Sequence, residues 1–440
     1  MEKYKSSQYN ILINQDDEYA TIYNCFSGGI VKLENEIYLM ISSESFHLES
    51  IKYGDELLKN GYIVNSRVDE FNKAKMQIES VMSNKTQENV SYVIAPTLNC
   101  NLRCVYCFQK DFRTDGSENI VTFDMLDQIR CFILESNKNN KLLKKININW
   151  FGGEPLLCYE QIVYFSKSLK AALSEKNIGF TCSMITNGTL LDEKKLRVLV
   201  SDCNLYRIQI TIDGEENTYC SKKQTTGEIF NRVLNNICLA TRYTKTTVRV
   251  NADKQNFNEL LRVSKSISQM DIKKDNLFIH FAQLRDYNNN TQVLNAYDDL
   301  EYWQAKYAFY STIDQHLPKK NTVPSFSVKP FCGLAKGNNL VIDYLGNLYK
   351  CEHYIGNPQK IVGTVADGVF YNSVYEKSFS LATDERCNNC DLFPICNYAQ
   401  CTAMHTFAGD DQICLCYANQ LETIKQKIKK YLEEHQDADS

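Results

Sequence analysis

The sequence of 440 residues has no apolar run of 18 residues and no cluster of positive charges. The first absence argues against a transmembrane helix. The second, together with a net charge of −4, argues against nucleic-acid binding. The opening residues also lack the apolar stretch of a secretory signal peptide. We therefore expect a cytoplasmic protein that acts on neither membranes nor nucleic acids.

Cysteine, by contrast, is abundant, with 18 residues, and it is unevenly placed. Because nothing in the sequence directs export, clustered cysteines point to metal binding rather than to disulfides. Three cysteines lie together at Cys100, Cys104 and Cys107, and eight fall between Cys332 and Cys416. The other seven are expected to act as small buried apolar side chains: Cys25, Cys131, Cys158, Cys182, Cys203, Cys220 and Cys238.

The first cysteine group has three residues and then two residues between its members. Three thiolates this close can hold three irons of a four-iron cluster, which leaves the fourth iron open to a substrate or cofactor. The alternative is a zinc site. Zinc normally takes four ligands, and no further Cys or His lies within twenty residues of Cys107. The spacing therefore favours an iron–sulfur cluster.

From Ser91 to Ile313, strand-like and helix-like segments alternate six times. This alternation predicts an α/β architecture with a parallel sheet and outer helices, and six units make a partial (β/α)6 TIM barrel rather than a closed eight-fold one. Unusual polar and glycine residues follow the strands, at the edge where such folds build their sites. These residues include Gly152–Pro155, Asn187, Asp213 and Arg249.

With Tyr106 just before its last cysteine, the first group resembles the signature of the radical S-adenosylmethionine (SAM) enzymes. Gly152-Gly-Glu-Pro155 resembles their GGEP motif, Thr186-Asn-Gly188 their TNG segment, and Asp213-Gly214 a strand end beside the SAM pocket. The resemblance implies one [4Fe–4S] cluster on the three cysteines and SAM on its open iron. The SAM contacts that it implies are Tyr106, Gly152, Gly153, Glu154, Pro155, Asn187, Asp213 and Arg249.

Some of these positions admit more than one role. Tyr106 either packs beside the adenine or braces the cluster loop, and Asn187 either contacts the ribose or only makes a turn. Relatives often carry an arginine after the Asp-Gly pair, which is missing here. Lys222 or Lys223 would take its place without the planar fork of an arginine.

The C-terminal cysteines follow a second pattern, with Gly346-x4-Cys351 followed by Cys387-x2-Cys390-x5-Cys396-x4-Cys401. This order resembles the SPASM domain, which carries auxiliary [4Fe–4S] clusters in peptide-modifying radical SAM enzymes. A zinc ribbon would explain only four of the cysteines. The resemblance implies an outer auxiliary cluster on Cys387, Cys390, Cys396 and one of Cys414 or Cys416. It implies an inner auxiliary cluster on Cys332, Cys351 and Cys401, left open to a substrate thiolate or closed by the spare cysteine or by His353.

Residues 1–88 form a separate unit by pattern. Short strands are expected at Tyr9–Asn14, Ala20–Tyr23 and Ile30–Leu33, and helices at Glu44–Asn60 and Asp69–Met82. The unit is similar to the winged-helix leader-recognition modules of peptide maturases, which add a leader peptide to a sheet edge. The expected domains are residues 1–88 for leader recognition, 89–320 for the radical SAM barrel, 321–420 for the SPASM domain and 421–440 for a C-terminal helix.

These resemblances imply a radical SAM peptide maturase that binds a ribosomally made precursor peptide and installs a crosslink, with a cysteine thioether as the leading hypothesis. An anaerobic sulfatase maturase, which forms formylglycine, is the alternative enzyme. An iron–sulfur scaffold or a zinc-binding protein is the alternative outside enzymes. The enzyme readings also imply an electron donor such as ferredoxin or flavodoxin.

Overall fold

The computed structural model describes residues 2–84, 86–113, 119–284, 295–297, 299–313, 332, 334, 336–381, 383–396, 401 and 417–435. The chain divides into two compact units. Unit 1 combines Met1–Ser83 with Lys320–Lys336 and Phe379–Ser440, and unit 2 combines Asn84–Lys319 with Gly337–Ser378. The four-part division expected from the sequence pattern stays a prediction.

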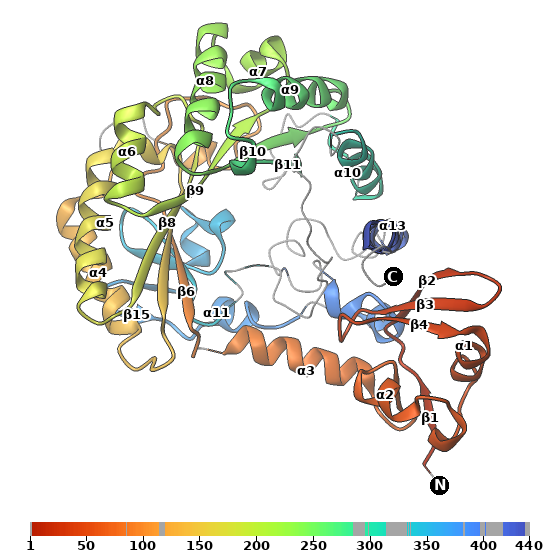
Figure 1. Cartoon of the computed structure of the whole chain (residues 1–440). Coiled ribbons are helices and arrows are strands. Elements are labelled where there is room, and N and C mark those ends of the chain that lie inside the picture. Colours follow the sequence, from red (N-terminus) through yellow and green to blue (C-terminus); the bar gives the residue numbers. More distant parts are fainter. Residues whose placement is uncertain are drawn as a thin grey trace. The chain divides into compact units, whose positions relative to one another are not determined.

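Unit 2 is built on six parallel strands that pair in the order in which they occur in the chain. Helices connect the strands and lie outside the curved sheet, which confirms the predicted partial barrel (Figure 1). The strands are β6 (Asn89–Ile94), β7 (Lys145–Trp150), β8 (Gly179–Thr186), β9 (Leu205–Ile212), β10 (Lys245–Ala252) and β11 (Leu277–Gln283). The helices are α4 (Phe123–Ser136), α5 (Tyr159–Ser174), α6 (Glu193–Ser201), α7 (Glu216–Lys223), α8 (Gly227–Tyr243), α9 (Phe257–Gln269) and α10 (Asp299–Ile313).

The two faces of this sheet differ in polarity. In β7 the apolar side chains Ile146, Ile148 and Trp150 are buried, and they alternate with two partly exposed asparagines. Because side chains alternate between the faces of a strand, one face carries the apolar core and the other carries polar groups. Hydrogen bonds cross that polar face from Thr181 to Asn147 at 3.2 Å and from Ser183 to Asn149 at 3.2 Å.

The sheet continues beyond the six barrel strands into the second cysteine region. β12 (Leu340–Ile342) pairs in parallel with β6, and β13 (Asn347–Tyr349), β14 (Gly363–Thr364) and β15 (Gly368–Val369) follow as an antiparallel extension. The short helix α11 (Ser373–Lys377) ends this part of the unit. Cys351 lies two residues after the end of β13, so the sheet positions one of the C-terminal cysteines.

Unit 1 contains an antiparallel sheet in the order β2 (Asn10–Gln15), β3 (Tyr19–Asn24) and β4 (Ile30–Glu34), and a separate pair of β1 (Tyr4–Ser6) with β5 (Ile63–Asn65). Its helices are α1 (Asn35–Ile41), α2 (Gly54–Lys59), α3 (Glu70–Ser83) and α13 (Tyr417–His435). The three strands expected in residues 9–33 are confirmed.

One helix expected in this unit is wrong. Glu44–Asn60 is not a single helix, because Tyr53 adopts a left-handed backbone conformation with φ of 65° directly before α2. A bulky residue in that region interrupts a right-handed helix. Only a single 3-10 turn at Leu48–Ser50 and the short α2 form there. The helix α1, which ends at Ile41, was not predicted from the sequence. Among the described residues, no helix has both the length and the apolar character needed to cross a membrane.

A shared apolar core joins the two ends of the chain within unit 1. Tyr9, Cys25 and Ile78 from the N-terminal elements pack in one cluster with Cys387 and Phe393 from the C-terminal segment. The Phe71 and Phe393 rings lie 4.7 Å apart. The N-terminal module and the last cysteine motif therefore fold around the same core.

Candidate active site

The residues predicted from the sequence collect at the carboxyl edge of the barrel strands. The cysteine loop follows β6, Gly152–Pro155 follows β7, and Asn187 follows β8. Asp213 directly follows β9, and Arg249 lies in β10. Since the strands are parallel and adjacent, their carboxyl ends bring these segments to one edge of the sheet.

Cys100, Cys104 and Cys107 lie on the loop after β6, each partly exposed. Burial raises the pKa of the Cys104 thiol to about 11; Lys223 opposes the shift, while Asp213, Cys107 and Cys100 add to it. Burial also raises the pKa of the Cys100 thiol, which Cys107 raises further. The three sulfur atoms are thus within electrostatic reach of one another.

The two glycines of the Gly152-Gly153 pair allow a close backbone contact. A Cβ on Gly152 would lie 2.3 Å from the carbonyl oxygen of Thr97, and one on Gly153 would lie 2.1 Å from that of Asn99. Gly152 also has a φ of 117°, which favours glycine. Gly153 N–H donates to Thr97 O at 3.0 Å, and Glu154 N–H donates to Asn99 O at 2.8 Å. The two glycines therefore allow the chain after β7 to pack closely against the segment that leads into Cys100.

Glu154 is fully buried, and its carboxylate joins two strand ends. Oε1 accepts hydrogen bonds from Leu156 N–H at 3.0 Å and from the Thr186 hydroxyl at 2.7 Å. Oε2 accepts from Asn187 N–H at 2.8 Å. Burial raises the pKa of Glu154 to about 6, and these hydrogen bonds oppose the shift. The carboxylate thus fixes the TNG segment against the GGEP segment.

The Asn187 side chain points to the cysteine loop. Its Nδ2 donates to Asn101 Oδ1 at 2.8 Å and lies 3.7 Å from Cys100 Sγ. Its Oδ1 accepts from the backbone N–H of Thr189 at 2.9 Å. In the structure, Asn187 therefore both shapes its own turn and reaches Cys100, a predicted cluster ligand; a ribose contact stays a prediction.

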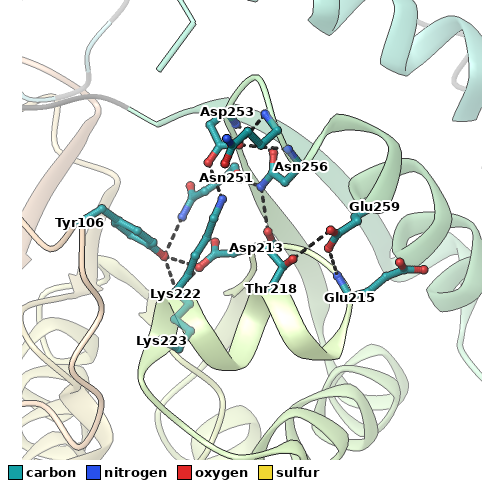
Figure 2. A network of polar contacts seen from close by, with 11 residues as sticks. Tyr106, Asp213, Glu215, Thr218, Lys222, Lys223, Asn251, Asp253, Asn256 and Glu259 are labelled. Carbon is teal, nitrogen blue, oxygen red and sulfur yellow. Dashed lines mark hydrogen bonds and ion pairs between the residues drawn. The ribbon is translucent and has the colours of Figure 1, made fainter. Parts of the chain in front are cut away.

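Tyr106 braces the loop through a polar network shown in Figure 2. Its hydroxyl donates to Asp213 Oδ2 at 2.5 Å and accepts from Lys223 Nζ at 2.6 Å and from Asn251 Nδ2 at 3.2 Å. Lys223 and Asp213 form an ion pair of 3.0 Å, with side chains 5% and 0% exposed. Lys222 instead pairs with Asp253 at 2.5 Å. Lys222 and Lys223, the two candidates to replace the missing arginine, thus each pair with a different carboxylate.

A second polar group, which the sequence reasoning did not assemble, surrounds Arg249. The guanidinium donates through Nε to Asn251 Oδ1 at 2.9 Å, which connects it to the Tyr106 network. Burial raises the pKa of Glu352, and Arg249 opposes that shift. Burial lowers the pKa of His280 and His353 to about 4 each, and Arg249 adds to both shifts. No sequence motif marks this group, since it gathers β10, β11 and the turn after Cys351.

An aromatic contact joins that turn to the cysteine loop. The Phe108 ring, next to Cys107, meets His353 edge to face at 4.7 Å between centroids. Phe108 also stacks on Phe151 at 6.4 Å. The loop, the GGEP segment and the residues after Cys351 therefore lie together within unit 2.

The sequence model of the Radical SAM superfamily matches residues 94–267, which run from the end of β6 through most of α9. All three loop cysteines and the GGEP segment fall inside this match. Residues 94–267 form a radical SAM domain. Membership in this superfamily implies a [4Fe–4S] cluster and SAM as cofactors of the domain.

Two relatives in sequence extend the likeness beyond the radical SAM domain. The cysteine-type anaerobic sulfatase-maturating enzyme of Clostridium novyi (strain NT) is 24% identical over 342 residues, covering 70% of this chain and 87% of the relative. The radical SAM cyclopropyl synthase TigE of Paramaledivibacter caminithermalis is 22% identical over 434 residues, covering 89% of this chain and 88% of the relative. The protein is thus a radical SAM enzyme whose homologues include a sulfatase-maturating enzyme.

A solved structure shares the fold across both units. The crystal structure of Streptococcus suis SuiB bound to the precursor peptide SuiA has a TM-score of 0.55 and 13% identity, and the match covers 93% of this chain and 98% of that chain. This likeness establishes the fold, in agreement with the predicted radical SAM barrel.

The loop residues fit the cluster of a radical SAM domain by donor type. Within the part of the chain that the structure describes, no three Cys, His, Asp or Glu side chains already surround a common metal position. The loop nevertheless offers three thiols that act on one another electrostatically, on a backbone seated by Gly152 and Gly153. Thiolates are the usual ligands of such clusters.

The C-terminal cysteines are distributed over both units. Cys332, Cys387, Cys390, Cys396 and Cys401 belong to unit 1, whereas Cys351 belongs to unit 2. In unit 1, Cys332, Cys390 and Cys396 are partly buried against the apolar cluster that contains Cys387. Burial raises the pKa of the Cys390 thiol to about 12. Cys414 and Cys416 lie outside the described residues.

Proposed function

We propose that the protein is a radical SAM maturase of a ribosomally made precursor peptide, and that the bond it installs is a cysteine thioether. The breadth of the likeness supports a peptide maturase over a sulfatase maturase. The match to TigE covers 89% of this chain, against 70% for the sulfatase-maturating enzyme. The match to SuiB, which was solved with its precursor peptide, covers 93%.

When bound, the reduced cluster and SAM supply a 5′-deoxyadenosyl radical that abstracts hydrogen from the peptide. Cys100, Cys104 and Cys107 would hold the cluster. Gly152, Gly153, Glu154, Pro155, Asn187 and Tyr106 would line the SAM site, as would Asp213 and Arg249. The carboxylate of Glu154 already accepts three hydrogen bonds, so it acts chiefly by fixing this edge. Asp213 Oδ1 is buried without a hydrogen-bond partner in the described residues, so it offers an acceptor to a bound group.

The C-terminal cysteines would hold two auxiliary [4Fe–4S] clusters. The outer cluster would use Cys387, Cys390, Cys396 and one of Cys414 or Cys416, and the inner cluster Cys332, Cys351 and Cys401. A free iron in the inner cluster would accept a substrate thiolate, which is the reason to favour a thioether. Electrons would come from a ferredoxin or flavodoxin.

Unit 1 would bind the leader of the precursor at an edge of its three-stranded sheet. β2 and β4 are the two edges, and β2 contacts α13. β4 contacts α1, the helix that directly continues it in the chain, so we assign the added peptide strand to the β4 edge. Hydrogen exchange of the full chain with and without precursor tests this role, because an added strand protects the outward amides of residues 30–34. Unchanged exchange there would remove leader binding from β4.

Mass spectrometry of a candidate precursor co-expressed with the enzyme tests the reaction itself. A thioether removes two hydrogens and also blocks one cysteine from alkylation by iodoacetamide. Loss of two hydrogens with every cysteine still alkylated would contradict the thioether and favour a carbon–carbon crosslink. An aldehyde that reacts with a hydrazide would favour formylglycine. Anaerobic protein that forms no 5′-deoxyadenosine with dithionite and SAM would favour a scaffold.

A further inference from the structure

The side chain of Lys223, at the end of α7, is buried at the base of the cysteine loop. It is 5% exposed, and it lies one residue before Gln224, which ends the helix in a left-handed conformation with φ of 53°. A buried ammonium requires a compensating charge and hydrogen bonds. Lys223 has both, because it contacts Asp213 after β9 and Tyr106 in the cysteine loop.

The side chains form a closed triangle of polar contacts (Figure 2). Lys223 Nζ lies 3.0 Å from Asp213 Oδ2 and 2.6 Å from the Tyr106 hydroxyl oxygen, and that hydroxyl donates to the same carboxylate oxygen at 2.5 Å. Without the ammonium, a fully buried carboxylate would keep the phenol as its only partner at this oxygen among the described residues. Removing one member of such a buried pair is far more costly than removing both.

The backbone at the end of α7 also holds the cysteine loop, through hydrogen bonds to its amides. Arg103 N–H donates to Lys223 O at 3.3 Å, and Val105 N–H donates to Lys222 O at 3.0 Å. These amides flank Cys104 on either side. Carbonyls in the last turn of a helix have no partner within the helix, so they are free to take partners from the loop.

The charges of Asp213 and Lys223 also affect the cluster that the cysteine loop would hold. The Lys223 ammonium and the Asp213 carboxylate both contact the hydroxyl of Tyr106, which lies between Cys104 and Cys107 in the loop. A positive charge beside a cluster favours its reduced, more negative state, and the net charge around a cluster is one of the factors that set its reduction potential.

We propose that Lys223 is the positioning residue of the cysteine loop: its ammonium neutralises Asp213, locks Tyr106 and the backbone around Cys104, and raises the reduction potential of the cluster held there. This inference rests on the radical SAM function of the loop. It assigns Lys223 to the support of the cluster rather than to the substrate.

The first test is hydrogen exchange of the full-length protein without its cluster, in Lys223→Met, Lys223→Arg and Lys222→Met. In Lys223→Met we expect exchange of the Arg103 and Val105 amides to rise at least about tenfold, since local opening becomes easier. The Lys223→Arg variant, which keeps the charge, restores much of the protection. Lys222→Met is the matched control, because its ion pair with Asp253 does not include Tyr106. Equal exchange of the Arg103 and Val105 amides in Lys223→Met and Lys222→Met would overturn the proposed role of Lys223 in holding the loop.

The second test measures the reduction potential of the cluster in order to separate the effect of charge from that of packing. This cluster is recognised by an electron paramagnetic resonance signal that changes when SAM is added. The potential should fall in Lys223→Met, rise in Asp213→Asn, and return toward the wild-type value in the double variant. A merely structural role would lower loading in all three variants without this alternation of sign. The double variant also retains charge balance if Lys223→Met fails to fold. Potentials that do not follow the sign of the charge would overturn the electrostatic part, whether or not the enzyme cleaves SAM.

Discussion

The two cysteine regions of the protein are supported in opposite ways. The loop with Cys104 is held by a buried network of charges and hydrogen bonds at the edge of the barrel sheet. The motif with Cys387 and Cys390 is instead packed against an apolar core that the first 83 residues help to build. The same residue type, cysteine, is thus placed by electrostatics in unit 2 and by packing in unit 1, so the two regions should respond to different perturbations.

The largest effect is expected from breaking the packed region. Phe393 is 1% exposed and contacts Phe71 across the shared core. Replacing it with alanine should cost unit 1 about 3–5 kcal/mol, as for other buried aromatic truncations. Hydrogen exchange should show both the Cys387–Cys396 segment and strands β2–β3 loosening together. Phe370→Ala, at a side chain 42% exposed in unit 2, is the control.

This shared core also limits how leader binding can be tested. Deleting the first 83 residues would expose the apolar surface around Cys387, so lost activity in such a truncation would not identify a leader site. If β2 and β3 stay protected in Phe393→Ala while the C-terminal segment opens, the two ends of the chain do not share one cooperative core.

Acid should weaken unit 2 through His280. Burial lowers the pKa of this histidine from 6.5 to about 4, and Arg249, Lys306 and Arg207 add to the shift. The unfolded chain therefore binds a proton between pH 6.5 and 4 that the folded chain does not, so stability falls as the pH falls through this range. A full shift of this size corresponds to about 3 kcal/mol.

The variant His280→Gln should therefore lose about 2–3 kcal/mol less stability than the wild type between pH 7 and 4. Thermal unfolding of the protein across this range measures the difference. His47→Gln in unit 1 is the control, since His47 is exposed. Equal acid sensitivity of His280→Gln and the wild type would show that another group controls the acid response of unit 2.

A smaller and more local effect is expected from a single methyl group under the cysteine loop. In Gly153→Ala the new Cβ would lie 2.1 Å from Asn99 O, which is backbone and cannot move without shifting the loop. We expect a loss of about 1–3 kcal/mol, typical of overpacking, together with weaker iron loading. Gly179→Ala, whose nearest contact would be 3.3 Å from Lys144 O, should change stability less. Normal iron content in Gly153→Ala would show that the loop tolerates displacement.

The barrel and its active edge were predictable because local pattern and global fold agree there. The alternation of apolar residues in β7 and the glycines after it carry the information within a few residues of sequence. By contrast, the expected helix at Glu44–Asn60 fails at Tyr53, whose left-handed conformation depends on its surroundings rather than on its own preference.

Contacts between segments that are far apart in the sequence could not be predicted either, because they also depend on the three-dimensional surroundings. Nothing near Leu340–Ile342 indicates that this three-residue strand would pair with β6. The choice between Lys222 and Lys223 likewise depends on which side chain of α7 turns toward Asp213, and only the structure shows that Lys223 does. The partners of Glu154 and Asn187 also come from the ends of other strands.

The pairing of β6 with β12 has a consequence for the synthesis of the chain. Ser91 N–H bonds to the side chain of Asn339, a separation of 248 positions. Ribosomes add about 5–20 residues per second, so β6 leaves the ribosome roughly 10–50 s before its outer neighbour exists. During that interval the edge of β6, which lies beside the cysteine loop, has unpaired backbone hydrogen-bonding groups. Iron insertion that waits for translation to finish would meet a sheet already closed on that flank.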